Sequence, residues 1–229
     1  MKTIIVTGAN GNLGVATVKK FLESGYRVIA VDHSGSHLEF ATKNDGFELH
    51  TVDLLDENAC ASFVNKIIAT HNSIDGALLL AGGFAMGDVS STGGKDLNNM
   101  LSLNFNTAYY MARPVMEHML LSGYGRLVFI GARPALQAAD GKNMVAYALS
   151  KSLLFKLADF INETAKGKNV VASVIVPSTI DTEINRKNMP GANPDNWVKP
   201  GQLADVLEFI CSDKGLPIRE ALYKVYNNA

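Results

Sequence analysis

Short β-branched, apolar runs alternate with longer amphipathic stretches along all 229 residues of the chain. This alternation predicts strands joined by helices, and such connections pair strands in parallel through right-handed crossovers. We therefore expect an α/β protein, a doubly wound and mostly parallel sheet with helices on both faces. The predicted strands are 3–7, 27–32, 47–53, 75–81, 126–131, 170–176 and 222–226, and the predicted helices are 12–24, 56–69, 97–121, 143–166 and 202–211.

No repeat or linker divides the sequence, so residues 1–229 are expected to form one domain. Pro114 lies inside the predicted helix 97–121 and predicts a bend there, because proline cannot donate the helical hydrogen bond. The segment 184–200 is rich in Asn, Pro and Gly. It is interpreted as a mobile flap over a ligand, with simple disorder as the alternative.

Composition favours an ordinary globular protein, with 47% hydrophobic residues and a formal net charge of −1. There is no basic block to bind nucleic acid or an anionic membrane, and no apolar run near the roughly 20 residues of a membrane span. No signal peptide is recognised, so a cytoplasmic location is expected. Cys60 and Cys211 are far apart and lack metal-ligand spacing, which predicts packing thiols and no metal site.

A glycine-spaced segment joins the first strand to the first helix, and this context is typical of a dinucleotide-binding Rossmann fold. Gly8 is expected to permit the tight turn, Gly11 to let the backbone approach a diphosphate, and Gly14 to let helix and strand pack closely. The diphosphate would rest on the helix N-terminus. The expected contacts also include Asn10, Asn12 and Leu13.

Two aspartates end predicted strands at the edge where a nucleotide would bind. Asp32 is placed to bond the adenosine ribose hydroxyls, and its charge would repel a 2′-phosphate, so NAD(H) is expected over NADP(H). The alternative is a turn capped with Ser34. Asp53 either accepts from the adenine amino group or caps a helix. Small residues expected beside the adenine ribose are Ala81, Gly82 and Gly83.

Tyr147 and Lys151 are four residues apart on a predicted helix, so their side chains leave the same face. An ammonium beside a phenol favours the phenolate and should lower the tyrosine pKa. This pair and the glycine segment together predict a nicotinamide-dependent oxidoreductase. Tyr147 would donate the proton and Lys151 would hold the nicotinamide ribose, the alternative being a solvated surface lysine.

With these motifs the chain resembles the short-chain dehydrogenase/reductase superfamily along its whole length. Segments 81–84, 131–136 and 181–190, together with Trp197, resemble the dihydropteridine reductases in particular. The resemblance implies reduction of quinonoid dihydropterin with NADH, by a homodimer or homotetramer built through the two long helices. Ala132 stands where most members of the superfamily carry a catalytic serine, and the dihydropteridine reductases share that loss.

Other positions depart from the narrower family. Asn104 matches the active-site asparagine of the broad superfamily, which the pterin enzymes usually lack. It would either hold a relay water or bond backbone inside a helix. Phe84 replaces a tryptophan, and the loop from Ala132 to Tyr147 is slightly longer.

The remaining expected site residues lie after predicted strands. Pro177 precedes a segment in which the Ile180 backbone and the Thr182 hydroxyl would fix the nicotinamide carboxamide. Phe84 and Trp197 would sandwich a flat substrate, unless they are core or loop-anchoring aromatics. The expected substrate-binding residues are Phe84, Ala132, Arg133, Tyr147 and Trp197.

Two rival functions remain open at this point. The first is reduction of another quinonoid, imine or carbonyl substrate. The second is a regulator that senses NAD(H) without catalysis, although a sensor has no need of a tuned phenol.

Overall fold

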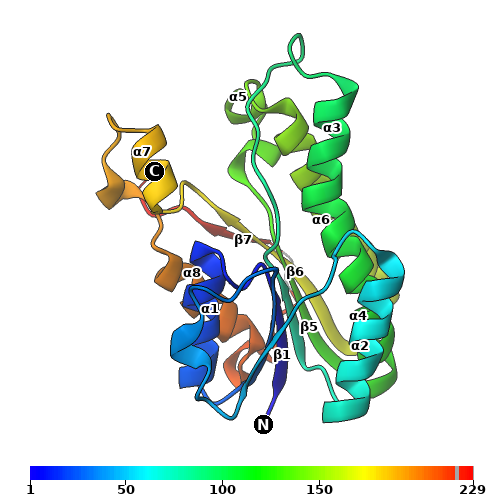
Figure 1. Ribbon diagram of the computed structural model, residues 1–229. Coiled ribbons are helices and arrows are strands. Elements are labelled where there is room, and N and C mark those ends of the chain that lie inside the picture. Colours follow the sequence, from blue (N-terminus) through cyan, green and yellow to red (C-terminus); the bar gives the residue numbers. More distant parts are fainter. Residues whose placement is uncertain (220–221, 229) are drawn as a thin grey trace.

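The computed structural model describes residues 1–219 and 222–228, and it forms one twisted sheet between two layers of helices (Figure 1). All seven strands pair in parallel in the order β3-β2-β1-β4-β5-β6-β7. Their bounds are β1 Thr3–Thr7, β2 Arg27–Val31, β3 Phe47–His50, β4 Gly76–Leu79, β5 Tyr124–Ile130, β6 Asn169–Pro177 and β7 Leu222–Val225. The doubly wound α/β fold is confirmed, and the sheet is entirely parallel.

The helices cover both faces of the sheet (Figure 1). Their bounds are α1 Asn12–Glu23, α2 Glu57–His71, α3 Gly94–Leu101, α4 Thr107–Ser122, α5 Ala138–Gly141, α6 Val145–Thr164, α7 Glu183–Asn188 and α8 Pro200–Cys211. The apolar residues of α1 and α8 pack on one face, and those of α2, α4 and α6 pack on the other. This division explains why the strands are apolar on both sides, as buried parallel strands are.

The order of strands reverses between β1 and β4, which are neighbours in the sheet although β2 and β3 separate them in sequence. In open parallel sheets, ligands bind outside the carboxyl ends of the strands at such a switch point. The glycine segment, Asp32 and residues 81–83 all follow the carboxyl ends of β1, β2 and β4. The topology therefore brings them to one edge.

Helix α4 continues through Pro114, so the proline does not end the helix, and the bend expected there stays a prediction. The expected helix 97–121 is instead interrupted by a π-helical segment at Ser102–Asn106. That segment contains the buried Asn104, whose side chain bonds groups outside its own helix.

The expected flap 184–200 contains more structure than its composition indicates. It includes α7 and a 3-10 turn at Pro194–Asn196, and it ends at Trp197 and Val198, which are buried. Val198 forms a bridge with Ile180. Within this segment, residues 189–193 and Lys199 are exposed and outside a helix.

Cys60 and Cys211 are both free and buried, in agreement with packing thiols. Among the described residues, no helix has both the length and the apolar character that crossing a bilayer requires. Within residues 1–219 and 222–228, no group of three or more His, Cys, Asp or Glu side chains is arranged to hold a metal ion.

Candidate active site

The glycine segment turns sharply between β1 and α1. Gly8 has a φ of +65°, and a Cβ there would lie 2.9 Å from the Ala81 backbone nitrogen. A Cβ on Gly14 would lie 2.1 Å from the Gly8 carbonyl oxygen. Gly11 differs, because it is exposed and the nearest atom to its Cβ would be 3.4 Å away. Packing within the protein therefore requires Gly8 and Gly14, whereas Gly11 leaves backbone open in front of the α1 N-terminus.

The other members of this segment differ in exposure. Asn12 is exposed at the start of α1 and Leu13 is half-buried against the core. No acidic side chain lies in the first turn of α1, and no side chain caps it. The free N–H groups and the helix dipole there favour a bound anion.

Asp32 follows β2 and turns both carboxylate oxygens toward backbone. One oxygen accepts the Asn10 N–H at 2.9 Å and the other accepts the Ser34 N–H at 3.4 Å. The expected turn with Ser34 is therefore present, and it coexists with a bond to the glycine segment. Arg27 begins β2, at the opposite edge of the sheet from Asp32.

Asp53 is exposed, and its carboxylate accepts the Leu55 N–H at 2.9 Å. The residue that caps α2 is Asp56, whose side chain accepts from Asn58 and Ala59. The helix-capping alternative is thus wrong for Asp53, because α2 begins at Glu57, four residues after the end of the expected strand.

Tyr147 and Lys151 lie on α6 beside the carboxyl end of β5. The Lys151 side chain is buried, and its ammonium donates to the Ile130 carbonyl at 2.8 Å. A solvated surface lysine is therefore excluded. The Tyr147 ring is half-buried and lies edge-on to Phe84, with ring centroids 5.0 Å apart.

The expected lowering of the Tyr147 pKa by Lys151 is wrong for the protein by itself. Burial raises the pKa of Tyr147 to about 12 and lowers the pKa of Lys151 to about 8. Desolvation penalises the charged form of each group, and the Lys151 ammonium donates to the Ile130 carbonyl. Near neutral pH the phenol is thus fully protonated.

Asn104 is 1% exposed and binds two neighbouring segments. Its Oδ1 accepts the Gly83 N–H at 2.9 Å, and its Nδ2 donates to Ser150 Oγ at 3.0 Å. Asn104 therefore bonds backbone, as one of the two interpretations expected, and the bonded group is the Gly83 N–H. A Cβ on Gly82 would lie 2.6 Å from Asn104 Oδ1 and 3.2 Å from Lys151 Nζ, so only glycine fits between them.

Ser150 is a site residue that the sequence did not lead us to predict. It is fully buried, accepts from Asn104, and donates to the Tyr147 carbonyl at 2.8 Å. It thus connects the π-helical segment to the turn of α6 that carries Tyr147. A serine one turn after the tyrosine, on the inward face, was the available signal.

Two of the expected substrate-binding residues lie in the turn after β5. Ala132 is buried and presents no hydroxyl. Arg133 pairs with Asp140 of α5 at 3.0 Å, and its guanidinium lies 5.7 Å from the Tyr226 ring centroid. The structure therefore assigns to Arg133 a role in holding α5 and the segment after β7 together.

The expected sandwich of Phe84 and Trp197 is wrong for this conformation. Trp197 is 4% exposed, so its indole offers no open face to a substrate, whereas Phe84 is 59% exposed. The Trp197 carbonyl accepts from Asn227 at 3.0 Å. Trp197 is thus a loop-anchoring aromatic, the alternative that the sequence left open.

The segment after β6 is held by α7. Pro177 ends β6 in the core, and the Ile180 carbonyl accepts from the Asn185 amide at 2.8 Å. Thr182 Oγ1 accepts the Asn185 N–H at 3.2 Å and caps α7. A hydroxyl can accept and donate at once, so the Thr182 proton remains available to a ligand.

With this geometry in view, the chain was compared with known proteins. The family profile described as short chain dehydrogenase matches residues 2–193. The chain belongs to the short-chain dehydrogenase family. This short-chain dehydrogenase is therefore an oxidoreductase that uses a nicotinamide dinucleotide, NAD(H) or NADP(H).

Relatives of this short-chain dehydrogenase carry several activities in their names. A dihydropteridine reductase of Dictyostelium discoideum is 29% identical, over 97% of this chain and 94% of its own. A 3-oxoacyl-[acyl-carrier-protein] reductase of Buchnera aphidicola is 27% identical, over 81% of this chain and 76% of its own.

Two solved structures share the fold. 4-Hydroxyisoleucine dehydrogenase complexed with NADH has a TM-score of 0.88 and 22% identity, covering 99% of this chain and 98% of that one. ElxO with NADP bound has a TM-score of 0.88 and 18% identity, covering 98% and 96%. At these identities the likeness concerns the fold alone.

The residues of this short-chain dehydrogenase fit a dinucleotide. A tight turn with Gly8 and Gly11 precedes a helix N-terminus that has no acid in its first turn. Asp32 lies at the end of the adjacent strand, and the Lys151 ammonium lies next to Gly82 across the switch point.

Proposed function

We propose that this chain reduces a quinonoid dihydropterin with NADH, using Tyr147 as the proton donor. The observation that carries the proposal is a protonated, half-buried phenol beside the exposed ring of Phe84, next to a position, Ala132, that lacks a hydroxyl. The identity of 29% to a protein named dihydropteridine reductase supports it.

Bound NADH supplies the hydride. The chain's own residues hold and move the proton. The pKa of Tyr147, raised by burial to about 12, keeps the hydroxyl protonated until the substrate takes the proton. Lys151 stays largely charged below its pKa of about 8, so its ammonium favours the phenolate that remains after proton transfer.

Ala132 bears on the substrate. A donor to a developing oxyanion contributes about 3–4 kcal/mol to the transition state where one is needed. Without a hydroxyl at Ala132, the site should act poorly on a plain ketone, whose reduction concentrates charge on one oxygen. A quinonoid pterin spreads charge over conjugated ring nitrogens and depends less on such a donor.

Phe84 is proposed to form one wall for this planar substrate. Its ring is held edge-on by Tyr147 at a centroid distance of 5.0 Å while most of its surface stays open. A flat heterocycle can stack on that open face within reach of the phenol.

NADH is proposed as the preferred coenzyme. The Asp32 carboxylate, fixed by two backbone N–H groups, lies where the adenosine ribose is expected. Gly11, Asn12 and Leu13 would surround the diphosphate, Asp53 and residues 81–83 would lie near the adenosine, and Pro177, Ile180 and Thr182 would face the nicotinamide.

The substrate flap is proposed to be shorter than its sequence predicts. Residues 194–200 are attached through the Ile180–Val198 bridge and through Asn227, whose amide also donates to the Asp195 carbonyl. Residues 183–193 have fewer anchors, chiefly the Thr182 cap and the ion pair of Arg186 with Asp181. We expect this part to move when ligands bind.

The test is NADH oxidation with quinonoid dihydropterin, comparing wild type with Tyr147→Phe. We expect turnover to fall by about 10²–10⁴, because the variant has no proton to donate. Tyr109→Phe on α4 is the matched control and should retain activity. Wild-type protein that binds NADH but leaves pterin unreduced would contradict the substrate assignment.

A second candidate is a reductase of another quinonoid, imine or carbonyl. The observation that favours it is Asn104, which matches the broad superfamily rather than the dihydropteridine reductases. A panel of quinones, imines and activated ketones, assayed with NADH beside the pterin, separates the two candidates.

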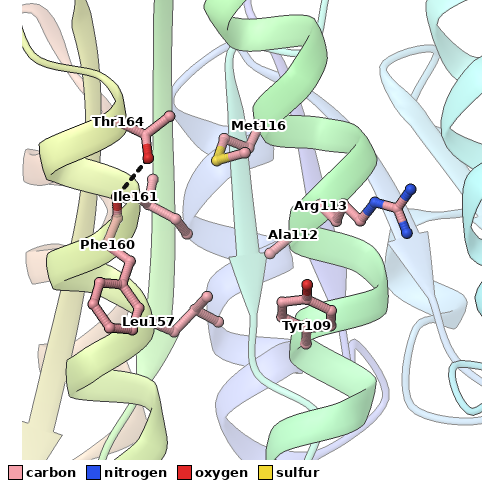
Figure 2. A pocket seen from close by; sticks show the side chains of 8 residues that line it. All are labelled: Tyr109, Ala112, Arg113, Met116, Leu157, Phe160, Ile161 and Thr164. Atoms are coloured by element: carbon pink, nitrogen blue, oxygen red, sulfur yellow. Dashed lines mark hydrogen bonds between the residues drawn. The ribbon is translucent and has the colours of Figure 1, made fainter.

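The chain is also proposed to form a dimer through α4 and α6. A groove of about 230 Å³ lies between them. Met116, Leu157 and Phe160 are among the side chains that line it (Figure 2). Phe160 is 63% exposed in one protomer, and a second copy would cover this apolar face. Light scattering tests the proposal, and a monomer at micromolar concentration would refute it.

A further inference from the structure

We propose that Asn10 is a positioning residue that sets the preference for NADH over NADPH, by holding residues 33–37 against the glycine segment. The inference rests on the proposed coenzyme use. It assigns to Asn10 an action through its neighbours, in place of direct contact with the diphosphate.

Asn10 makes four hydrogen bonds across a separation of more than 20 residues. Its side-chain Oδ1 accepts the His37 N–H at 2.8 Å, and its Nδ2 donates to Ser36 Oγ at 3.3 Å. Its backbone N–H donates to Asp32 Oδ2 at 2.9 Å, and its carbonyl lies 3.0 Å from His37 Nδ1. Both ends of the side chain are thus bound within the protein.

The contact with the carbonyl fixes the imidazole of His37. A carbonyl oxygen only accepts, so Nδ1 must carry the hydrogen. In the neutral ring Nε2 is then an acceptor, which suits the hydroxyl of a ribose better than a phosphate. His37 is exposed, so this acceptor is accessible to a ligand.

The loop that Asn10 holds has no fixed positive charge. Residues 33–37 read His-Ser-Gly-Ser-His, without lysine or arginine. Ser34 Oγ donates to Ser36 Oγ at 3.3 Å, and the Ser34 N–H donates to Asp32. Backbone N–H groups thus hold the Asp32 carboxylate, and residues 33–37 bring no lysine or arginine to balance a 2′-phosphate.

The far end of the loop is anchored in the core. Leu38 is 1% exposed, and a Cβ on Gly35 would lie 2.4 Å from Leu49 Cδ2, so the chain passes directly over that side chain. Asn10 fastens the near end. Without Asn10 the loop would keep its anchor at Leu38 but lose its register on the glycine segment.

NADH and NADPH share the diphosphate and differ only at the adenosine 2′-position. A change that loosens the glycine segment itself would weaken both coenzymes equally. A change that releases only residues 33–37 would weaken NADH, which gains from Asp32 and the loop, and would leave NADPH almost unchanged.

The experiment titrates purified Asn10→Ala with NADH and, separately, with NADPH, and follows nucleotide fluorescence without substrate. We expect the Kd for NADH to rise about tenfold, equivalent to about 1.4 kcal/mol, and the Kd for NADPH to change less than twofold. Asn44→Ala is the matched control, because the Asn44 side chain accepts the Gly46 N–H in the turn before β3, away from residues 33–37 in sequence. It should leave both values unchanged.

A second pair of variants tests the same contact from the other side. His37→Leu should reproduce the selective loss of NADH affinity, and His37→Asn should restore most of it, because its amide nitrogen replaces Nδ1. Equal weakening of both coenzymes in Asn10→Ala, or no change in either, would overturn the inference. Wild-type protein that binds neither coenzyme would overturn the proposed function instead, so the two failures are distinguishable.

Discussion

The two halves of the switch point satisfy their polar groups very differently. On the β1–β2 side, Asn10, Asp32 and Ser34 bond one another and the backbone. On the β5–α6 side, the buried Lys151 ammonium has one carbonyl as its partner, and among the described residues no group hydrogen-bonds the Tyr147 hydroxyl.

This difference separates binding from chemistry. A recognition loop with satisfied hydrogen bonds is rigid and stabilises the fold, so it presents a fixed surface to a ligand. A buried lysine and phenol without counter-charges destabilise the fold, and they persist where a reaction needs their altered protonation. A substitution on the β1–β2 side should therefore lower stability, whereas a substitution of the buried Lys151 should raise stability while it lowers activity.

The largest effect is expected for Lys151→Met. We expect at least a hundredfold loss of NADH-dependent turnover, because the ammonium that favours the phenolate is gone. The same variant should melt a few degrees higher without coenzyme. The shift of the Lys151 pKa from 10.5 to about 8 corresponds to about 3 kcal/mol. That exceeds the roughly 1–3 kcal/mol lost when the Ile130 carbonyl is orphaned.

Lys156→Met on the exposed face of α6 is the control. Its turnover and its melting temperature should both stay at the wild-type level. The direction in which stability changes with pH also follows from this pKa shift. Between pH 8 and 10.5 the unfolded lysine binds a proton that the folded one does not, so wild-type stability should rise with pH in that window. A lower melting temperature for Lys151→Met at pH 7 would break the contrast between the two sides.

A tenfold effect is expected for Asp32→Asn on the recognition side. Removing the charge should improve the Kd for NADPH about tenfold and weaken NADH by a similar factor, since the repulsion of a 2′-phosphate disappears. Fluorescence titration measures both values, and Asp45→Asn in the turn before β3 is the control. Unchanged preference in Asp32→Asn would remove Asp32 from coenzyme selection.

The smallest effect is expected from pH alone. The Lys151 ammonium is lost as pH rises through about 8, so kcat/KM for NADH should fall about fourfold between pH 7 and pH 8.5. A profile measured at constant ionic strength tests this decline. A flat profile to pH 9 would mean that the ammonium keeps its charge and that burial of Lys151 has no kinetic consequence.

The sequence predicted the elements whose residues carry a local signal. Period and β-branching located all seven strands to within a few residues, and glycine spacing located the turn at Gly8. The mostly parallel pairing followed from the alternation of strands with helices, because crossover connections permit little else.

The features that sequence could not predict depend on contacts between distant residues. The expected helix 97–121 was written without the π-helical segment around Asn104, whose side chain bonds Gly83 and Ser150 from other parts of the chain. The Tyr147 pKa was assigned the wrong direction, because four-residue spacing says nothing of the Ile130 carbonyl to which Lys151 turns. The composition of its loop could not predict whether the Trp197 side chain is buried or exposed.

The π-helical turn at Ser102–Asn106 sets how the two helices on either side of it, α3 and α4, are oriented about their axes. An additional residue in one turn rotates everything after it by about 100° relative to everything before it. Upstream, α3 packs beside α6; downstream, α4 packs against α2 and lines the groove of Figure 2. Deleting a single residue from that turn should rotate Tyr109 and Met116 away from the groove, so this five-residue segment sets the angle between the proposed catalytic residues and the proposed subunit contact.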